Sequence, residues 1–177
     1  MSGSIGFRTM LAAASLLLAA ALNQDPYAQE KPMTQKTPPL PAQPYVVATA
    51  QSIAGTIKDL QSANKAQDLI DAGGIGCRVF IQHEKDAAGN QAEIHEAADD
   101  IFVILEGSAT FALGGTLDTP KETQPGEWRA PGISGGKEFT VTKGGVLIVP
   151  RGTPHRRVTA GLDVTLMVIK SFAPARS

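Results

Sequence analysis

Short runs of β-prone residues, each ended by turn residues, constrain the fold of this chain more than any other feature. They begin after Gly73 and Gly74 and continue almost to the C-terminus without an intervening helical pattern. Short strands without crossover helices are typical of an antiparallel barrel or sandwich, not of an α/β fold. The predicted strands are residues 77–82, 92–95, 101–105, 109–113, 138–142, 146–149 and 164–169. The sequence therefore predicts an all-β domain.

Two connections in this region have a distinct composition. Glu106, Gly107 and Ser108 predict a tight hairpin turn, in which Gly107 can adopt the positive φ that other residues avoid. Residues 114–137 are rich in Gly, Pro and Thr and predict a long loop that carries the single Trp128. Trp128 is expected either in a functional rim or as a plug at the edge of the sheet.

A helix is expected before the strands. Thr49 can cap it, and Ile53, Ile57 and Leu60 fall on one helical face. This apolar face predicts a short amphipathic helix that packs across the outside of the β domain.

The N-terminal region has the composition of a targeting segment. Arg8 precedes an uncharged apolar run over residues 10–22, and Ala28 offers a cleavage site. This run is shorter than the ~20 residues that a membrane-spanning helix needs. Residues 1–28 therefore predict a signal peptide, with an uncleaved anchor as the alternative, and residues 29–44 a Pro-rich linker. Residues 45–177 are the expected folded domain, in a periplasmic or secreted protein.

Charge and cysteine content exclude one class of partner and one source of stability. The formal net charge is −1, so no broad basic surface is available for nucleic acid, which we do not expect as a partner. Cys77 is the only cysteine, so an internal disulfide is excluded and the domain depends on its core.

Ionisable residues cluster around three of the predicted strands. Glu93 and His95 alternate with Ile94 and therefore point to the same face of their strand. Asp100 begins the next strand after a short connection that returns the chain close to His95. A sharp turn at Pro150 and Gly152 presents His155 from a distant part of the sequence. We expect these side chains to meet in one pocket.

Two segments that carry these residues resemble the paired motifs of the cupin superfamily. Residues 144–155 match the second motif, G-x5-P-x-G-x2-H, which ends at His155. Residues 93–107 match the first motif in His95 and Gly107, but Glu93 stands in place of its first His and Asp100 in place of its Glu. The resemblance implies a small single-domain cupin, a double-stranded β-helix or jelly-roll barrel. It also implies that this barrel forms homodimers.

The resemblance further implies a divalent metal ion held at these positions, with Glu93, His95, Asp100 and His155 as ligands. Two imidazoles and two carboxylates suit Fe(II) or Mn(II), and Zn(II) is also acceptable. Because Asp is one methylene shorter than Glu, Asp100 is at risk of falling short of the ion. The remaining set would then be Glu93, His95 and His155, which resembles a 2-His-1-carboxylate centre with open positions.

Two functions follow from this constellation. One is a metal-dependent enzyme acting on a small organic molecule, of oxidoreductase (dioxygenase) or isomerase or lyase type, in which Glu93 or Asp100 is the catalytic acid or base. The other is a barrel that is metal-free or non-catalytic and binds a sugar or an organic acid. Fold alone does not choose between them.

Further basic residues near the motifs are secondary candidates. His83 follows Val79 and Ile81 in strand alternation and is either a further cavity residue or a surface or hydrogen-bonded structural residue. Arg151, Arg156 and Arg157 flank His155 and form either an anion-binding group or a solvated rim.

Overall fold

A computed structural model describes residues 45–70, 76–85, 90–158 and 162–173. The expected signal peptide, residues 1–28, and the expected linker, residues 29–44, lie outside these ranges. In the described ranges, no helix combines the length and the apolar character needed to cross a membrane.

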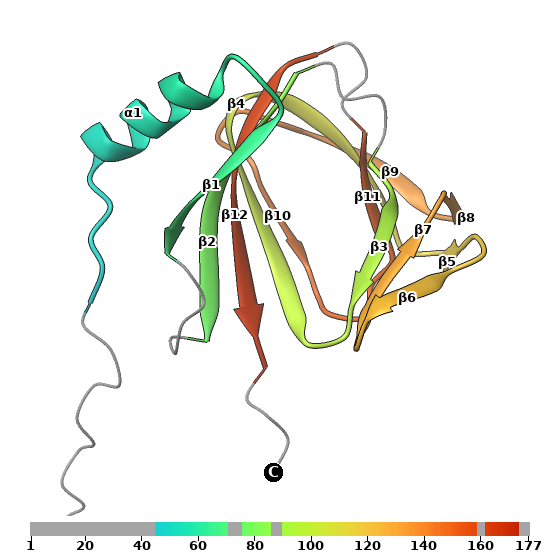
Figure 1. Cartoon of the computed structure of the whole chain (residues 1–177). Coiled ribbons are helices and arrows are strands. Elements are labelled where there is room, and N and C mark those ends of the chain that lie inside the picture. The colour runs from blue at the N-terminus through green and yellow to red at the C-terminus, as the bar shows by residue number, and fades with distance from the viewer. Residues whose placement is uncertain (1–44, 71–75, 86–89, 159–161, 174–177) are drawn as a thin grey trace, which may run out of the picture. The chain divides into compact units, whose positions relative to one another are not determined.

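The predicted helix is confirmed as α1, Ala50–Leu60. Thr49 caps it, because its Oγ1 accepts a hydrogen bond from the backbone N of Ser52 at 3.1 Å. Thr56 and Leu60 are its buried residues. The helix lies on the outside of the domain, beside the first two strands (Figure 1).

All other secondary-structure elements of the described residues are strands, and the all-β fold class is confirmed. They are β1 (Lys65–Ile70), β2 (Cys77–Glu84), β3 (Ala92–His95), β4 (Ala98–Leu113), β5 (Thr116–Leu117), β6 (Lys121–Gln124), β7 (Glu127–Ala130), β8 (Ile133–Ser134), β9 (Lys137–Thr142), β10 (Val146–Val149), β11 (His155–Val158) and β12 (Val164–Phe172). Every strand pair is antiparallel, and the main sheet has the order β1-β2-β12-β4-β11-β3-β7-β6, with β9 and β10 also paired to β4. The sheet curls into a barrel (Figure 1).

The long strand β4 joins the two halves of the barrel, and the hairpin predicted at residues 106–108 is wrong. β4 pairs with β12 and β10 through its first half and with β11 and β9 through its second half. Gly107 does have a positive φ, +76°, but it lies next to an irregularity in the register with β12, not in a reversal of the chain. A bulge of this kind bends a strand from one sheet into the next.

The predicted loop at residues 114–137 contains the short strands β5 to β8. β7 pairs with β3 and places Trp128 opposite Ile94. Trp128 packs against a small cluster of Ala92, Leu117 and Ala130, and its Nε1 donates to Oε1 of Glu96 at 2.8 Å. Trp128 therefore packs beside β3 as part of this small cluster.

The barrel interior changes from apolar to polar along the inward-facing positions of β4 and β12. The core consists of Phe80, Phe102, Ile104, Ala109, Phe111, Val149, Val164, Leu166 and Val168. On β4 the inward positions run from Ile104 through Phe102 to Asp100, and on β12 from Leu166 through Val168 to Lys170. Because inward side chains recur at every second residue, the same strands that build the core also deliver the charged groups of the cavity.

Candidate metal centre

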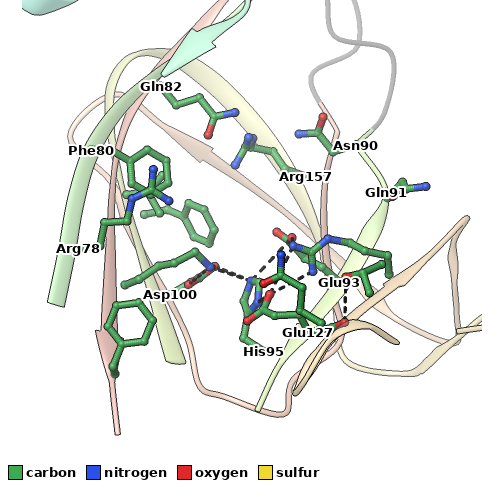
Figure 2. Close-up of a pocket in the computed structure, with 17 residues that line it drawn as sticks. Arg78, Phe80, Gln82, Asn90, Gln91, Glu93, His95, Asp100, Glu127 and Arg157 are labelled. Carbon is green, nitrogen blue, oxygen red and sulfur yellow. Dashed lines mark hydrogen bonds and ion pairs between the residues drawn. The ribbon is translucent and has the colours of Figure 1, made fainter. Parts of the chain in front are cut away.

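A polar cavity of about 600 Å³ lies inside the barrel. Its lining combines charged and amide side chains with a few aromatic rings, two of which, Phe80 and Phe102, also belong to the core. Glu93, His95 and Asp100 gather at one end of this cavity, and Gln82, Asn90 and Arg157 lie at the other (Figure 2). The domain therefore has room for a small molecule beside a group of ionisable residues.

The structure brings together the residues that the sequence singled out. Glu93, His95, Asp100 and His155 each offer one nitrogen or oxygen atom, and these atoms all lie within 4.8 Å of one another. The side chains of His95, Asp100 and His155 are 2 to 4% exposed, whereas that of Glu93 is 29% exposed. Asp100 reaches its neighbours despite its short side chain, with Oδ2 3.3 Å from Nε2 of His95. The group could hold a metal ion.

The turn at Pro150–Thr153 positions His155. Thr153 N donates to the carbonyl of Pro150 at 3.1 Å, and Gly152 N donates to the carbonyl of His95 at 2.8 Å. The second bond fastens the turn to the end of β3. The next residues then pair with β3 in a register that sets His155 opposite Glu93. Directly opposed residues of an antiparallel pair share a face, so His155 lies buried beside Glu93, which lines the cavity.

The ring nitrogens of His155 have different environments. Nδ1 donates to the backbone carbonyl of Thr153 at 2.9 Å. Nε2 lies 3.3 Å from Oε1 of Glu93 and 3.5 Å from Oδ2 of Asp100. It is buried, and the described residues give it no hydrogen-bond partner of regular geometry. Nε2 therefore faces two carboxylates that together favour a cation at this point.

His95 has a carboxylate on one side of its ring and an ammonium group on the other. Its Nδ1 lies 2.6 Å from Oε2 of Glu127, and its Nε2 lies 2.8 Å from Nζ of Lys170. Register explains both contacts, because Glu127 on β7 stands opposite His95 and Lys170 on β12 stands opposite Asp100.

Sequence reasoning missed both Glu127 and Lys170. Glu127 fell in a predicted loop, and the predicted last strand ended one residue before Lys170. The alternation of Leu166, Val168 and Lys170 was a signal that could have placed Lys170 on the inward face.

The charges of the site shift the pKa values of its members. Burial raises the pKa of Glu93, but its contacts with His155, His95 and Arg129 outweigh burial and lower this pKa to about 2. The pKa of Asp100 is likewise far below its ordinary value, because His155, His95 and Lys170 outweigh its burial. Burial lowers the pKa of His155, whereas its contacts with Asp100 and Glu93 raise it to about 9.

Without a metal ion, the stability of the protein should therefore depend on pH. The contribution of His155 is present below its ordinary pKa of 6.5 and lost as pH rises through about 9. That of Glu93 is present above 4.5 and lost only as pH falls through about 2. We expect the free energy of unfolding in EDTA to fall by a few kcal/mol between pH 6.5 and 9, at about 1.4 kcal/mol per unit. Urea denaturation measures it. A flat profile, or an equal fall in His155→Gln, would contradict the assignment.

The secondary candidates lie in different places. His83 is buried outside the cavity, with Nδ1 2.9 Å from Oγ1 of Thr165. Arg151 pairs with Asp99 at 2.6 Å and does not line the cavity. Arg157 does line it. Strand alternation decides the positions of His83 and Arg157, whereas Arg151 lies in the turn before β11.

The far end of the cavity is built around a buried ion pair. Both Nε and Nη2 of Arg157 donate to the carboxylate of Glu84, the former at 3.0 Å. Gln82 and Asn90 donate to Oε1 of Glu84 at 2.8 and 3.0 Å. The side chains of Arg157 and Glu84 are only 9% and 4% exposed. This network holds the guanidinium against the cavity wall.

Comparison with known proteins gives structural matches only. No protein-family model matches the chain, and neither does any curated protein. Among solved structures, a cupin-2 domain protein from Shewanella frigidimarina is 13% identical, with 66% of this chain and 89% of that chain covered and a TM-score of 0.46.

Two enzymes are similar to the chain at the same level. A structure of DMSP lyases is 14% identical, with 62% and 48% coverage and a TM-score of 0.45. Oxalate oxidase in complex with glycolate is 16% identical, with 62% and 51% coverage and a TM-score of 0.45. The chain spans about half the length of these two proteins. Likeness at this level of identity says nothing of a reaction.

The topology and the site agree with the motifs. The described strands form an antiparallel barrel with one short helix outside it. The residues at the motif positions converge inside that barrel. The described domain is therefore a small single antiparallel β-barrel with the four motif residues gathered in its interior.

Proposed function

We propose that this protein binds a divalent metal ion through Glu93, His95, Asp100 and His155 and acts as an enzyme on a small organic molecule in the cavity. The reaction is of oxidoreductase or of isomerase or lyase type. One observation carries the proposal: ligand-type atoms of these residues come within 4.8 Å of one another beside a polar cavity of about 600 Å³. Burying so many ionisable groups is costly unless an ion or a reaction uses them.

The donor set suits such an ion. The buried Nε2 of His155 makes no regular hydrogen bond within the described residues and faces the carboxylates of Glu93 and Asp100. A cation at this point would bind the nitrogen and both carboxylates. Nδ1 of His155 is held by the carbonyl of Thr153 and Nδ1 of His95 by Glu127, so both rings present Nε2 to the site. Partners of this kind orient metal-binding imidazoles in proteins. Two imidazoles and two carboxylates favour Fe(II) or Mn(II), with Zn(II) acceptable.

Each residue has a distinct task in the proposed enzyme. An ion bound here would supply a Lewis acid that polarises an oxygen of the substrate. Glu93 is the most exposed of the four residues and lines the cavity, and its low pKa keeps it ionised as a ligand for the ion. Arg129 Nη2, 3.2 Å from Oε2 of Glu93, orients that carboxylate. Asp100, 2% exposed, fixes the geometry of the centre.

A metal-free binding barrel is the second candidate, and one contact favours it. Nζ of Lys170 lies 2.8 Å from Oδ1 of Asp100 and 2.8 Å from Nε2 of His95. An ammonium group already supplies a positive charge to part of the ligand set. In this alternative the cavity binds a sugar or an organic acid without an ion.

Metal analysis of the full chain separates the two candidates. We expect protein purified without added metal to contain a stoichiometric transition metal by inductively coupled plasma mass spectrometry. His155→Ala should bind Mn(II) at least about 100-fold more weakly, since removing even a partner of a ligand costs 10- to 100-fold. Asp100→Asn should also bind more weakly. Asp118→Asn is the matched control, because Asp118 accepts a hydrogen bond from Ser134 and does not line the cavity.

The outcomes are distinct. Metal that is lost from His155→Ala and Asp100→Asn but kept in Asp118→Asn supports the centre. A parent protein that binds no Mn(II), Fe(II) or Zn(II), yet binds an organic acid or sugar by calorimetry, would replace the enzyme with the binding barrel.

A further inference from the structure

We propose that Lys170 competes with a divalent metal ion for the centre. Its ammonium group contacts two of the ligand side chains, and the ion binds only when the ammonium group moves away from them. The inference rests on the proposed metal-binding function. It concerns how readily the site accepts an ion.

Lys170 is fixed against the centre by the register of the sheet. It stands on β12 opposite Asp100 on β4, so both side chains point into the cavity. Nζ lies 2.8 and 3.1 Å from the two carboxylate oxygens of Asp100 and 2.8 Å from Nε2 of His95. These are hydrogen-bond distances, and the side chain of Lys170 is only 19% exposed. The ammonium group is therefore part of the site.

Lys170 and a metal ion require the same lone pair of His95. Nδ1 of His95 lies 2.6 Å from Oε2 of Glu127, and an ionised carboxylate only accepts hydrogen bonds, so Nδ1 carries the hydrogen. The lone pair of the ring is then on Nε2, where an N–H of Lys170 donates to it. A metal ion would bind this same lone pair. His95 cannot serve both partners at once.

The competition divides the ligand set into two halves. Lys170 contacts His95 and Asp100, whereas Glu93 contacts Arg129 at 3.2 Å and His155 at 3.3 Å. An arriving dication therefore meets two ligands that Lys170 does not contact and two that the ammonium group of Lys170 holds. Like charges at this separation repel strongly in a partly buried site, so the ammonium group has to move away. The cavity, which Lys170 and Glu127 both line, gives it a place to go.

Replacing Lys170 with a neutral side chain should tighten metal binding. The probe is MnCl₂, titrated by calorimetry into the full chain after EDTA treatment and dialysis, in one buffer. We expect Lys170→Met to bind Mn(II) at least tenfold more tightly than the parent protein. Lys143→Met, which removes an exposed lysine from the turn after β9, is the matched control and should bind as the parent does. Lys170→Gln, whose neutral side chain keeps a polar end, is the second variant if Lys170→Met does not fold by circular dichroism.

Each result has one meaning. Tighter binding in Lys170→Met, or binding there alone, supports the competition. Equal or weaker binding in Lys170→Met, with the parent protein binding, overturns it and leaves the proposed metal centre standing, with weaker binding showing that Lys170 positions the ligands. Absence of Mn(II) binding in the parent, Lys170→Met and Lys170→Gln overturns the metal centre and the competition together.

Discussion

Glu84→Ala is expected to lower the free energy of unfolding by roughly 3 to 5 kcal/mol, because it leaves the guanidinium of Arg157 buried without its counter-charge. Arg157 is 9% exposed and makes two hydrogen bonds to Glu84. The variant also deprives Gln82 and Asn90 of their shared acceptor. Urea denaturation followed by the fluorescence of the single Trp128 measures the loss.

A double variant separates the cost of an unpaired charge from the worth of the pair. Glu84→Leu with Arg157→Met removes both charges and fills the space with apolar side chains, so it should recover most of the lost stability. The control is Asp68→Ala, which breaks the exposed Arg78–Asp68 pair on β2 and β1, where the side chains are 40% and 43% exposed. Such a pair contributes at most about 1 kcal/mol. A Glu84→Ala loss no larger than that of Asp68→Ala would contradict the buried-charge account.

Gly107→Ala is expected to destabilise the domain by roughly 2 to 4 kcal/mol, through backbone strain and a steric clash together. Gly107 has a φ of +76°, which residues other than glycine rarely adopt. A Cβ added there would lie 2.2 Å from the carbonyl oxygen of Asp163, so the backbone would have to shift. Thermal and urea denaturation measure the effect.

Gly144→Ala is the matched control for Gly107→Ala. Gly144 has a similar φ of +82°, but a Cβ added there meets nothing within 4 Å. It should therefore cost only the conformational strain, about 1 kcal/mol. Equal losses in the two variants would show that the close approach of Asp163 to Gly107 does not matter to the bend of β4.

The site was largely predictable because local rules govern much of it. Strand alternation put Glu93 and His95 on one face, and both line the cavity. The turn at Pro150 and Gly152 depends on residue types with special backbone preferences, and it presents His155 as expected. Thr49 caps α1 for the same local reason. In each case neighbouring residues in the sequence determine the outcome.

The errors arose where a residue's behaviour depends on another strand. Gly107 has the local signal of a turn, yet β4 continues through it because β12 pairs on one side of it and β9 and β11 pair beyond it. Residues 114–137 read as a loop because their strands are short, and these strands exist through pairing with β3 and with each other. Pairing over long sequence separation leaves little trace in the local pattern.

The sequence by itself determined the all-β class, the capped helix and the four residues that come together inside the barrel. Only the tertiary structure decided that Glu127 and Lys170 hold His95 from its two sides and that Arg157 is neutralised by Glu84. The physical reason is register: which residue stands opposite which is set by the pairing of distant strands, and a shift by one residue would turn each of these side chains to the other face.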